Sequence, residues 1–164
     1  MKKTTRTLAI ANLIGLSAVL IMNYPANALP LHGKSTGELS DQYPNLFTPA
    51  PVTFAIWGVV YGWLLVWGAF QLAALFNQKA AAKMEPMLDK IGWLFAYSCL
   101  LNIAWLFAWH WEQVLIALAI LANMLYILTQ LNRAAAVGVS ATSKLEKWLE
   151  HVPLGIYQGW LSVA

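Results

Sequence analysis

The side chains that could take part in chemistry here are aromatic rings and amides at helical spacing. Trp57 and Tyr61 are four residues apart, so in a helix their rings stack on one face. Asn102 and Trp105 are three apart and share a face in the same way. Four segments of the chain present such rings beside hydrogen-bonding groups. The candidate ligand-contacting residues are Trp57, Tyr61, Asn102, Trp105, Tyr126 and Tyr157.

These groups favour binding over catalysis. A mostly apolar pocket with a few orienting polar groups is typical of a small-molecule site, and aromatic faces hold a flat hydrophobic ligand by stacking. An amide in the middle of a membrane is costly unless paired, so Asn102 is expected to point into a helical bundle. The alternative interpretation is that Asn102 only joins neighbouring helices.

The sequence offers little for metal binding or turnover. His32, His110 and His151 are scattered and near expected water, with no pair at ligand spacing on one helix, so we expect no metal site formed by the protein. One histidine could still serve as an axial ligand to a bound haem. A buried carboxylate pair, a nucleophile elbow and a phosphate loop are missing from the sequence. We therefore expect no catalytic residues and no required cofactor, and nothing in the spacing supplies an acid, base or nucleophile for an enzymatic role.

Small residues line another face of the same segment as Trp57. Gly58 and Gly62 have the spacing at which a neighbouring helix can approach closely, and Ala55 precedes them. One interpretation is packing inside the bundle or a contact between two copies. The other is that the small face packs while the aromatic face lines a cavity.

Composition determines which elements must position these residues. Of 164 residues, 60% are hydrophobic and only 10% are charged, against about a quarter in soluble domains. Long uncharged runs are the length that a helix needs to cross a bilayer, and their uniform apolarity argues against a barrel. The net charge of +3 forms no basic stripe, so we expect no nucleic-acid partner. The lone Cys99 cannot form an intrachain disulfide.

The predicted fold is all-α: a polytopic transmembrane bundle in a single domain, 1–164. The fifth helix begins at Pro153, which suits a first helical turn. About 12 residues give roughly 18 Å of helix, too short to span, so we expect the fifth span to be truncated at the chain end. The five expected spans are 7–28, 51–77, 91–110, 112–132 and an incomplete 152–164.

Basic residues predict the orientation. The first span resembles a secretory signal, with a basic start and Ala26-Asn27-Ala28 as a cleavage-like motif, but we favour a retained transmembrane helix. Lys and Arg gather before the first span, in the expected loop 78–90 and after the fourth span, so the N-terminus is expected in the cytoplasm. The membrane would be a bacterial inner membrane or an organelle membrane.

Several short motifs resemble one known family. They are a proline-led entry at Pro49 and Pro51, Trp57-x-x-x-Tyr61, Leu101-Asn102-x-x-Trp105, and Val152-Pro153 followed by Tyr157. Together they resemble the tryptophan-rich sensory protein family, which includes the translocator protein or peripheral benzodiazepine receptor. The stretch 28–50 is similar to the first loop of a divergent branch related to TspO/MBR proteins.

The resemblance implies a function. It suggests a five-helix membrane protein, often dimeric, that binds tetrapyrroles and other flat hydrophobic molecules in a pocket under the first loop. By motif, Trp57, Tyr61, Asn102, Trp105 and Tyr157 would line that pocket. The chain departs from the family where Leu46-Phe47-Thr48 replaces a tryptophan, and where Ala55-Ile56 and Leu106-Phe107 replace prolines. These departures leave the identity of the ligand open.

Two functions are therefore predicted. The first is a receptor, sensor or carrier for a tetrapyrrole-like or sterol-like ligand, with porphyrin or haem as candidates. The alternative is a structural or assembly subunit of a larger membrane complex. The expected partners are the lipid bilayer, a hydrophobic small molecule, and either a second copy or a larger complex.

Overall fold

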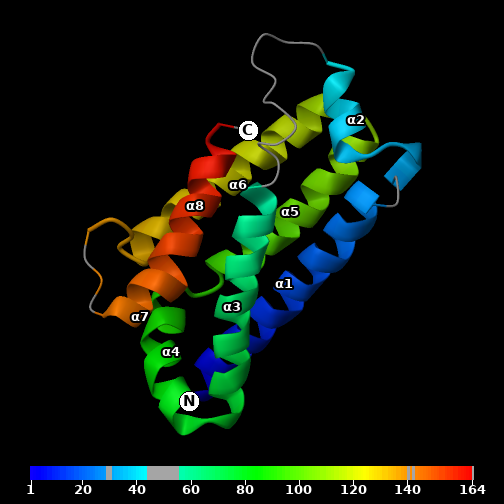
Figure 1. Cartoon of the computed structure of the whole chain (residues 1–164). Helices are drawn as coiled ribbons and strands as arrows, with labels where there is room; N and C mark the ends of the chain where they lie inside the picture. The colour runs from blue at the N-terminus through cyan, green and yellow to red at the C-terminus, as the bar shows by residue number, and fades with distance from the viewer. Residues whose placement is uncertain (29–30, 44–55, 140, 142, 164) are drawn as a thin grey trace.

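The computed structural model describes residues 1–28, 31–43, 56–139, 141 and 143–163. Every element in these ranges is a helix, as predicted (Figure 1). The elements are α1 (Lys3–Ala28), η1 (Leu31–Gly33), α2 (Thr36–Asp41), α3 (Ile56–Phe76), α4 (Gln78–Ile91), α5 (Leu94–His110), α6 (Val114–Ala134), α7 (Lys144–Glu146), the π-helix η3 (Lys147–His151) and α8 (Val152–Leu161).

Three of these helices, α1, α3 and α6, are long and apolar enough to cross a membrane. The pair α4 and α5, bent by 65° at a short break, counts as a fourth span if its two helices are taken together. The outward faces carry large exposed hydrophobic side chains, which water would disfavour and lipid accommodates. Examples are Ile14, Ile21, Leu65, Phe76, Leu100, Leu115 and Leu118.

The segment 78–90, predicted as a loop, is the helix α4. Asn77 caps it, because its side-chain oxygen accepts hydrogen bonds from two backbone N–H groups of the first turn, at 2.8 and 3.3 Å. The apolar residues recur at helical spacing and pack into the bundle. Gly92 follows with a φ of +52°, a left-handed conformation that favours glycine and turns the chain into α5. The buried residues of α4 are Ala81, Met84, Met87, Leu88 and Ile91.

The count of five spans is not confirmed. The predicted spans 7–28 and 112–132 correspond closely to α1 and α6, and 91–110 begins three residues early. The predicted span 51–77 corresponds to α3 from residue 56, because 51–55 lie outside the described residues. The fifth predicted helix is the ten-residue α8, which continues directly from α7 and η3 and carries Pro153 in its first turn.

Two glycines bring α1 close to its neighbours. A Cβ atom added at Gly15 would lie 3.1 Å from the Cβ atom of Cys99 on α5. A Cβ atom at Gly68 of α3 would lie 3.0 Å from the Cδ2 atom of Leu16. A Cβ atom at Gly15 would press on the Cβ atom of Cys99, and one at Gly68 on the end of the Leu16 side chain, so both glycines favour the close packing on which membrane helices depend.

A buried hydrogen bond and an aromatic contact also hold the bundle. The Asn12 amide of α1 donates to the Gln71 side chain of α3 at 3.2 Å. Trp67 meets Phe95 edge to face, with ring centroids 4.6 Å apart. Both contacts join helices distant in sequence, so they fix which helix faces meet.

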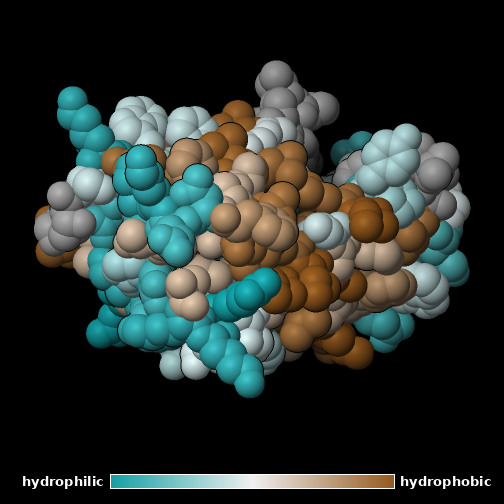
Figure 2. All heavy atoms as spheres, turned by 90° about the horizontal axis from the view of Figure 1, so that it is seen from below, coloured by the Kyte–Doolittle hydropathy of each residue, from teal (hydrophilic) through white to brown (hydrophobic). Residues whose placement is uncertain are grey.

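Two of the three ion pairs among the described residues lie at the end of the bundle where the chain begins. Lys2 pairs with Asp89 at 3.2 Å, and Lys90 pairs with Glu146 at 2.6 Å. Figure 2 looks onto this end and shows hydrophilic side chains on one side of it and hydrophobic ones over the adjacent flank. The three basic segments, namely the N-terminus, 78–90 and the segment after α6, thus share one end, as alternating spans require. Which side of the membrane this end faces stays a prediction.

Candidate functional site

Aromatic rings from α3 and α8 pack together at the end of the bundle away from α4. Trp57 and Tyr61, one turn apart on α3, stack with centroids 5.3 Å apart and planes 19° from parallel. Trp57 also meets Tyr157 and Trp160 of α8 edge-on, each at 6.1 Å. The i, i+4 spacing produces the stack, whereas the packing of α8 on α3 produces the edge contacts.

A polar core lies beside these rings. Asn102 of α5 is 3% exposed; its oxygen accepts from the Asn23 amide at 3.0 Å, and its amide donates to the Tyr157 hydroxyl at 3.4 Å. The Tyr157 hydroxyl in turn donates to the Met124 sulfur at 3.6 Å. One buried amide therefore joins α1, α5 and α8, and Tyr157 extends the network to α6.

A second aromatic group lies further along α5, under the first loop. Trp105 and Trp109 stack with centroids 5.9 Å apart and planes 9° from parallel. The Trp109 indole donates to the Thr36 carbonyl of α2 at 3.4 Å, and Tyr43 packs against the same ring at 5.9 Å. The short helix α2 therefore covers this end of the bundle.

A capping box holds α2 in shape. The Ser35 hydroxyl accepts from the Glu38 N–H at 3.3 Å, and the Glu38 carboxylate accepts from the Ser35 N–H at 2.7 Å. The hydrogen bond from the Ser35 backbone N–H, followed by an interaction with the Ser35 side chain, lowers the pKa of the exposed Glu38 carboxyl below its ordinary value of 4.5. The other side of α2 buries Leu39.

The structure brings together four of the predicted ligand-contacting residues: Trp57, Tyr61, Asn102 and Tyr157. Trp105 lies one turn beyond Asn102 and packs with Trp109 instead. Tyr126 is 60% exposed on the outer face of α6 and lies apart from the cluster. The reason is that α6 turns a different stripe inward, formed by Ala117, Met124, Ile127, Leu128 and Leu131.

The chain was also compared with known proteins. The family model described as TSPO-like protein matches residues 9–164, nearly the whole chain. The chain belongs to the TSPO-like protein family. The resemblance found in the short motifs is thereby confirmed, and with the apolar helices it makes this an integral membrane protein of the TspO kind. Neither the search of curated proteins nor the search of solved structures found a match.

Sequence reasoning missed several contacts in this TSPO-like protein. Asn23 stands alone in an apolar run, and its polarity was the available signal. Trp109 was not among the candidate residues, although its spacing of four from Trp105 indicated the stack. Met124 and Trp160 gave no signal, because their roles depend on which faces of α6 and α8 point toward Tyr157 and Trp57.

The small face of α3 is open. Among the described residues, nothing lies within 4 Å of a Cβ atom added at Gly58 or Gly62, so these glycines do not pack against a helix there. Ala55, the third predicted packing residue, lies outside the described residues. The open face borders a hollow of about 450 Å³, and the predicted contact with a second copy stays a prediction. The hollow is lined by Gly58, Val59, Gly62, Trp63, Val66, Trp148 and Leu149.

Proposed function

We propose that this TSPO-like protein binds a flat hydrophobic molecule, tetrapyrrole-like or sterol-like, as a receptor, sensor or carrier. The site is the end of the bundle that α2 covers. The observation that carries the proposal is the buried Asn102 amide beside the stacked Trp57 and Tyr61 rings. The family membership supports the same function.

The chemistry of the cluster suits such a ligand. Trp57 and Tyr61 are only partly buried, so part of their ring surface stays accessible to a ligand that stacks. Asn102 can exchange one of its protein hydrogen bonds for one to a pyrrole N–H, a keto group or a hydroxyl. The groups that contact Asn102 and Tyr157 are amides, a phenol and a thioether, which can orient a ligand but do not provide a carboxylate, imidazole or amine for acid–base chemistry. The geometry therefore favours binding without turnover.

A fluorescence titration of the detergent-purified protein with protoporphyrin IX tests the proposal. We expect saturable quenching at one ligand per chain, weakened in both Trp57→Phe and Trp105→Phe. Trp93→Phe is the matched control, because Trp93 is 56% exposed and lies at the opposite end of α5. Linear, non-saturating quenching would mean partitioning into detergent and would overturn the proposal.

A second function, an assembly subunit of a membrane complex, is favoured by the open face of α3. Gly58 and Gly62 border an apolar hollow without contacting another described helix, as expected of a surface that a partner helix covers. This function predicts co-purification with a partner, or with a second copy, at fixed stoichiometry in mild detergent. A protein that runs alone as a monomer and saturates with ligand would favour the first function.

A further inference from the structure

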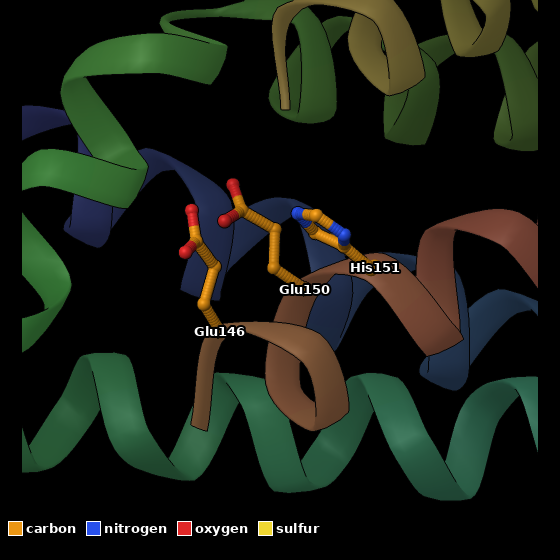
Figure 3. Close-up of side chains that lie close together, drawn as sticks. All are labelled: Glu146, Glu150 and His151. Atoms are coloured by element: carbon orange, nitrogen blue, oxygen red, sulfur yellow. The ribbon is translucent and has the colours of Figure 1, made fainter. Parts of the chain in front are cut away.

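Two glutamates and a histidine gather where the chain enters α8. Potential ligand atoms of Glu146, Glu150 and His151 all lie within 4.8 Å of one another. All three side chains are buried, at 2%, 0% and 8% exposure. Figure 3 shows them projecting to the same side of one continuous helical segment, with Glu150 between the other two. This cluster lies apart from the proposed ligand site, near Lys90 of α4.

The π-helix η3 explains why three residues of one segment converge. The Val152 N–H donates to the Lys147 carbonyl, five residues back rather than the usual four. In a turn widened in this way, both Glu150 and His151 lie about one turn from Glu146. A regular α-helix would place Glu150 above Glu146 and turn His151 away. Single π-turns within α-helices are frequent at functional sites.

The cluster contains buried polar atoms without protein partners. In the described part of the chain, neither oxygen of Glu150 nor Nε2 of His151 has a hydrogen-bond partner. Such atoms are rare in folded proteins because burial removes their hydrogen bonds to water, and a bound cation would give them a partner. Lys90 bonds to Glu146, so one cation faces two carboxylates.

Burial also changes the pKa of Glu150. Burial raises the pKa of the Glu150 carboxyl to about 7; the charge of Glu146 adds to this effect and the charge of Lys90 opposes it. A divalent cation between the two carboxylates would offset the repulsion between them.

We propose that Glu146, Glu150 and His151 form a binding site for a divalent transition metal ion such as Zn²⁺. Two carboxylates and an imidazole are a ligand set that Zn²⁺ accepts, at bond lengths of about 2.0–2.2 Å. Ligand atoms in such a tetrahedron lie about 3.4 Å apart, so the side chains must draw together by about 1 Å. Three protein ligands leave a position for water or another ligand.

The site has a path to solvent. A hollow of about 410 Å³ lies between α4 and the start of α7 and has Glu146 in its wall. We predicted no metal site from the sequence because we looked for pairs of histidines on one helix. That criterion does not detect a site formed by one histidine and two carboxylates. The hollow is lined by Lys83, Pro86, Met87, Lys90, Ser143, Leu145 and Glu146.

Calorimetric titration of the full-length protein with ZnCl₂ tests the assignment. The protein is purified in detergent without a polyhistidine tag, stripped with EDTA and exchanged into chelator-free buffer. We expect one Zn²⁺ per chain, with affinity lowered about tenfold or more in Glu150→Gln and in His151→Gln. Glu150→Gln keeps the shape of the side chain and removes a buried charge, so this variant should fold. His110→Gln is the matched control, because His110 is a buried histidine outside the cluster.

Two further readouts sharpen the test. Co²⁺ bound in place of Zn²⁺ should show visible absorption bands that change in His151→Gln, because an imidazole ligand is lost. A millimolar excess of Mg²⁺ should not displace Zn²⁺, since Mg²⁺ prefers oxygen ligands in an octahedral arrangement. Absence of saturable binding would overturn the proposal. So would an affinity that is equal in the wild type, Glu150→Gln and His151→Gln, because it would place the ion elsewhere on the protein.

Discussion

Replacing Lys90 by methionine should destabilise the protein more than replacing its partner Glu146 by glutamine. The Lys90 ammonium lies 2.6 Å from a Glu146 carboxylate oxygen, and the two side chains are 39% and 3% exposed. The change Lys90→Met leaves a buried carboxylate without its cation. The change Glu146→Gln leaves a lysine that water can still solvate. The asymmetry in burial therefore predicts an asymmetry in stability.

The magnitude follows from the geometry. At an effective dielectric constant of about 20, two charges at this separation attract by about 6 kcal/mol, most of which is offset by the desolvation of Glu146. Removing one partner of a fully buried pair costs about 3–5 kcal/mol. Because Lys90 is partly exposed and screened, we expect a loss of about 2 kcal/mol for Lys90→Met. For Glu146→Gln we expect about 1 kcal/mol or less.

The free energy of unfolding can be measured in mixed micelles with an increasing fraction of SDS, followed by far-ultraviolet circular dichroism. EDTA is included so that no metal ion takes the place of the lysine. Lys83→Met is the control, an exposed lysine on the same helix. The double variant of Lys90 and Glu146 should be about as stable as Glu146→Gln alone. If Glu146→Gln lowers the free energy of unfolding as much as Lys90→Met does, the reasoning is refuted.

Three further predictions concern other parts of the molecule. Glu38 has a lowered pKa, so its stabilising effect on α2 is present above its ordinary value of 4.5 and is lost as the pH falls through the lowered value. Ser35→Ala removes the contribution of the side chain and keeps the backbone N–H, so it should move the Glu38 pKa part of the way up toward 4.5, measured by NMR titration; an unchanged pKa would show that the Ser35 side chain does not act on the carboxyl. Gly15→Ala should destabilise the bundle by about 1–3 kcal/mol because the Cβ atom of Cys99 cannot give way, whereas Gly58→Ala should be neutral or stabilise by up to about 1 kcal/mol, both measured by SDS unfolding. Equal effects of the two changes would argue against the packing described. Tyr157→Phe removes the hydroxyl bonded to Asn102 and should cost about 0.6 kcal/mol in the same assay, and a stabilising effect would show that the hydroxyl is not satisfied.

Much of the fold and part of the site follow from local sequence patterns. Long uncharged runs determine that the elements are membrane helices, because a backbone in lipid must satisfy its own hydrogen bonds. The spacing of four between Trp57 and Tyr61 determines their stack, because helical geometry alone brings such residues together. The features that mark α4 are also local: the cap at Asn77 and a stripe of apolar residues at helical spacing. The prediction of a loop was wrong because it gave weight to the lysines of this segment and not to these two features.

The tertiary structure decided which face of each helix meets a neighbour. Gly58 and Gly62 are four residues apart, the spacing of a common helix-packing motif, yet Gly15 and Gly68 are the glycines that closely contact a neighbouring helix. Tyr126 points outward because α6 buries a different stripe. Sequence patterns fix the residues that share a face, but the rotation of each helix depends on contacts between segments far apart in the chain. The π-turn at Lys147–His151 is also a feature that only the tertiary structure shows. Its one extra residue per turn brings Glu150 and His151 beside Glu146, whereas α-helical spacing would keep His151 apart.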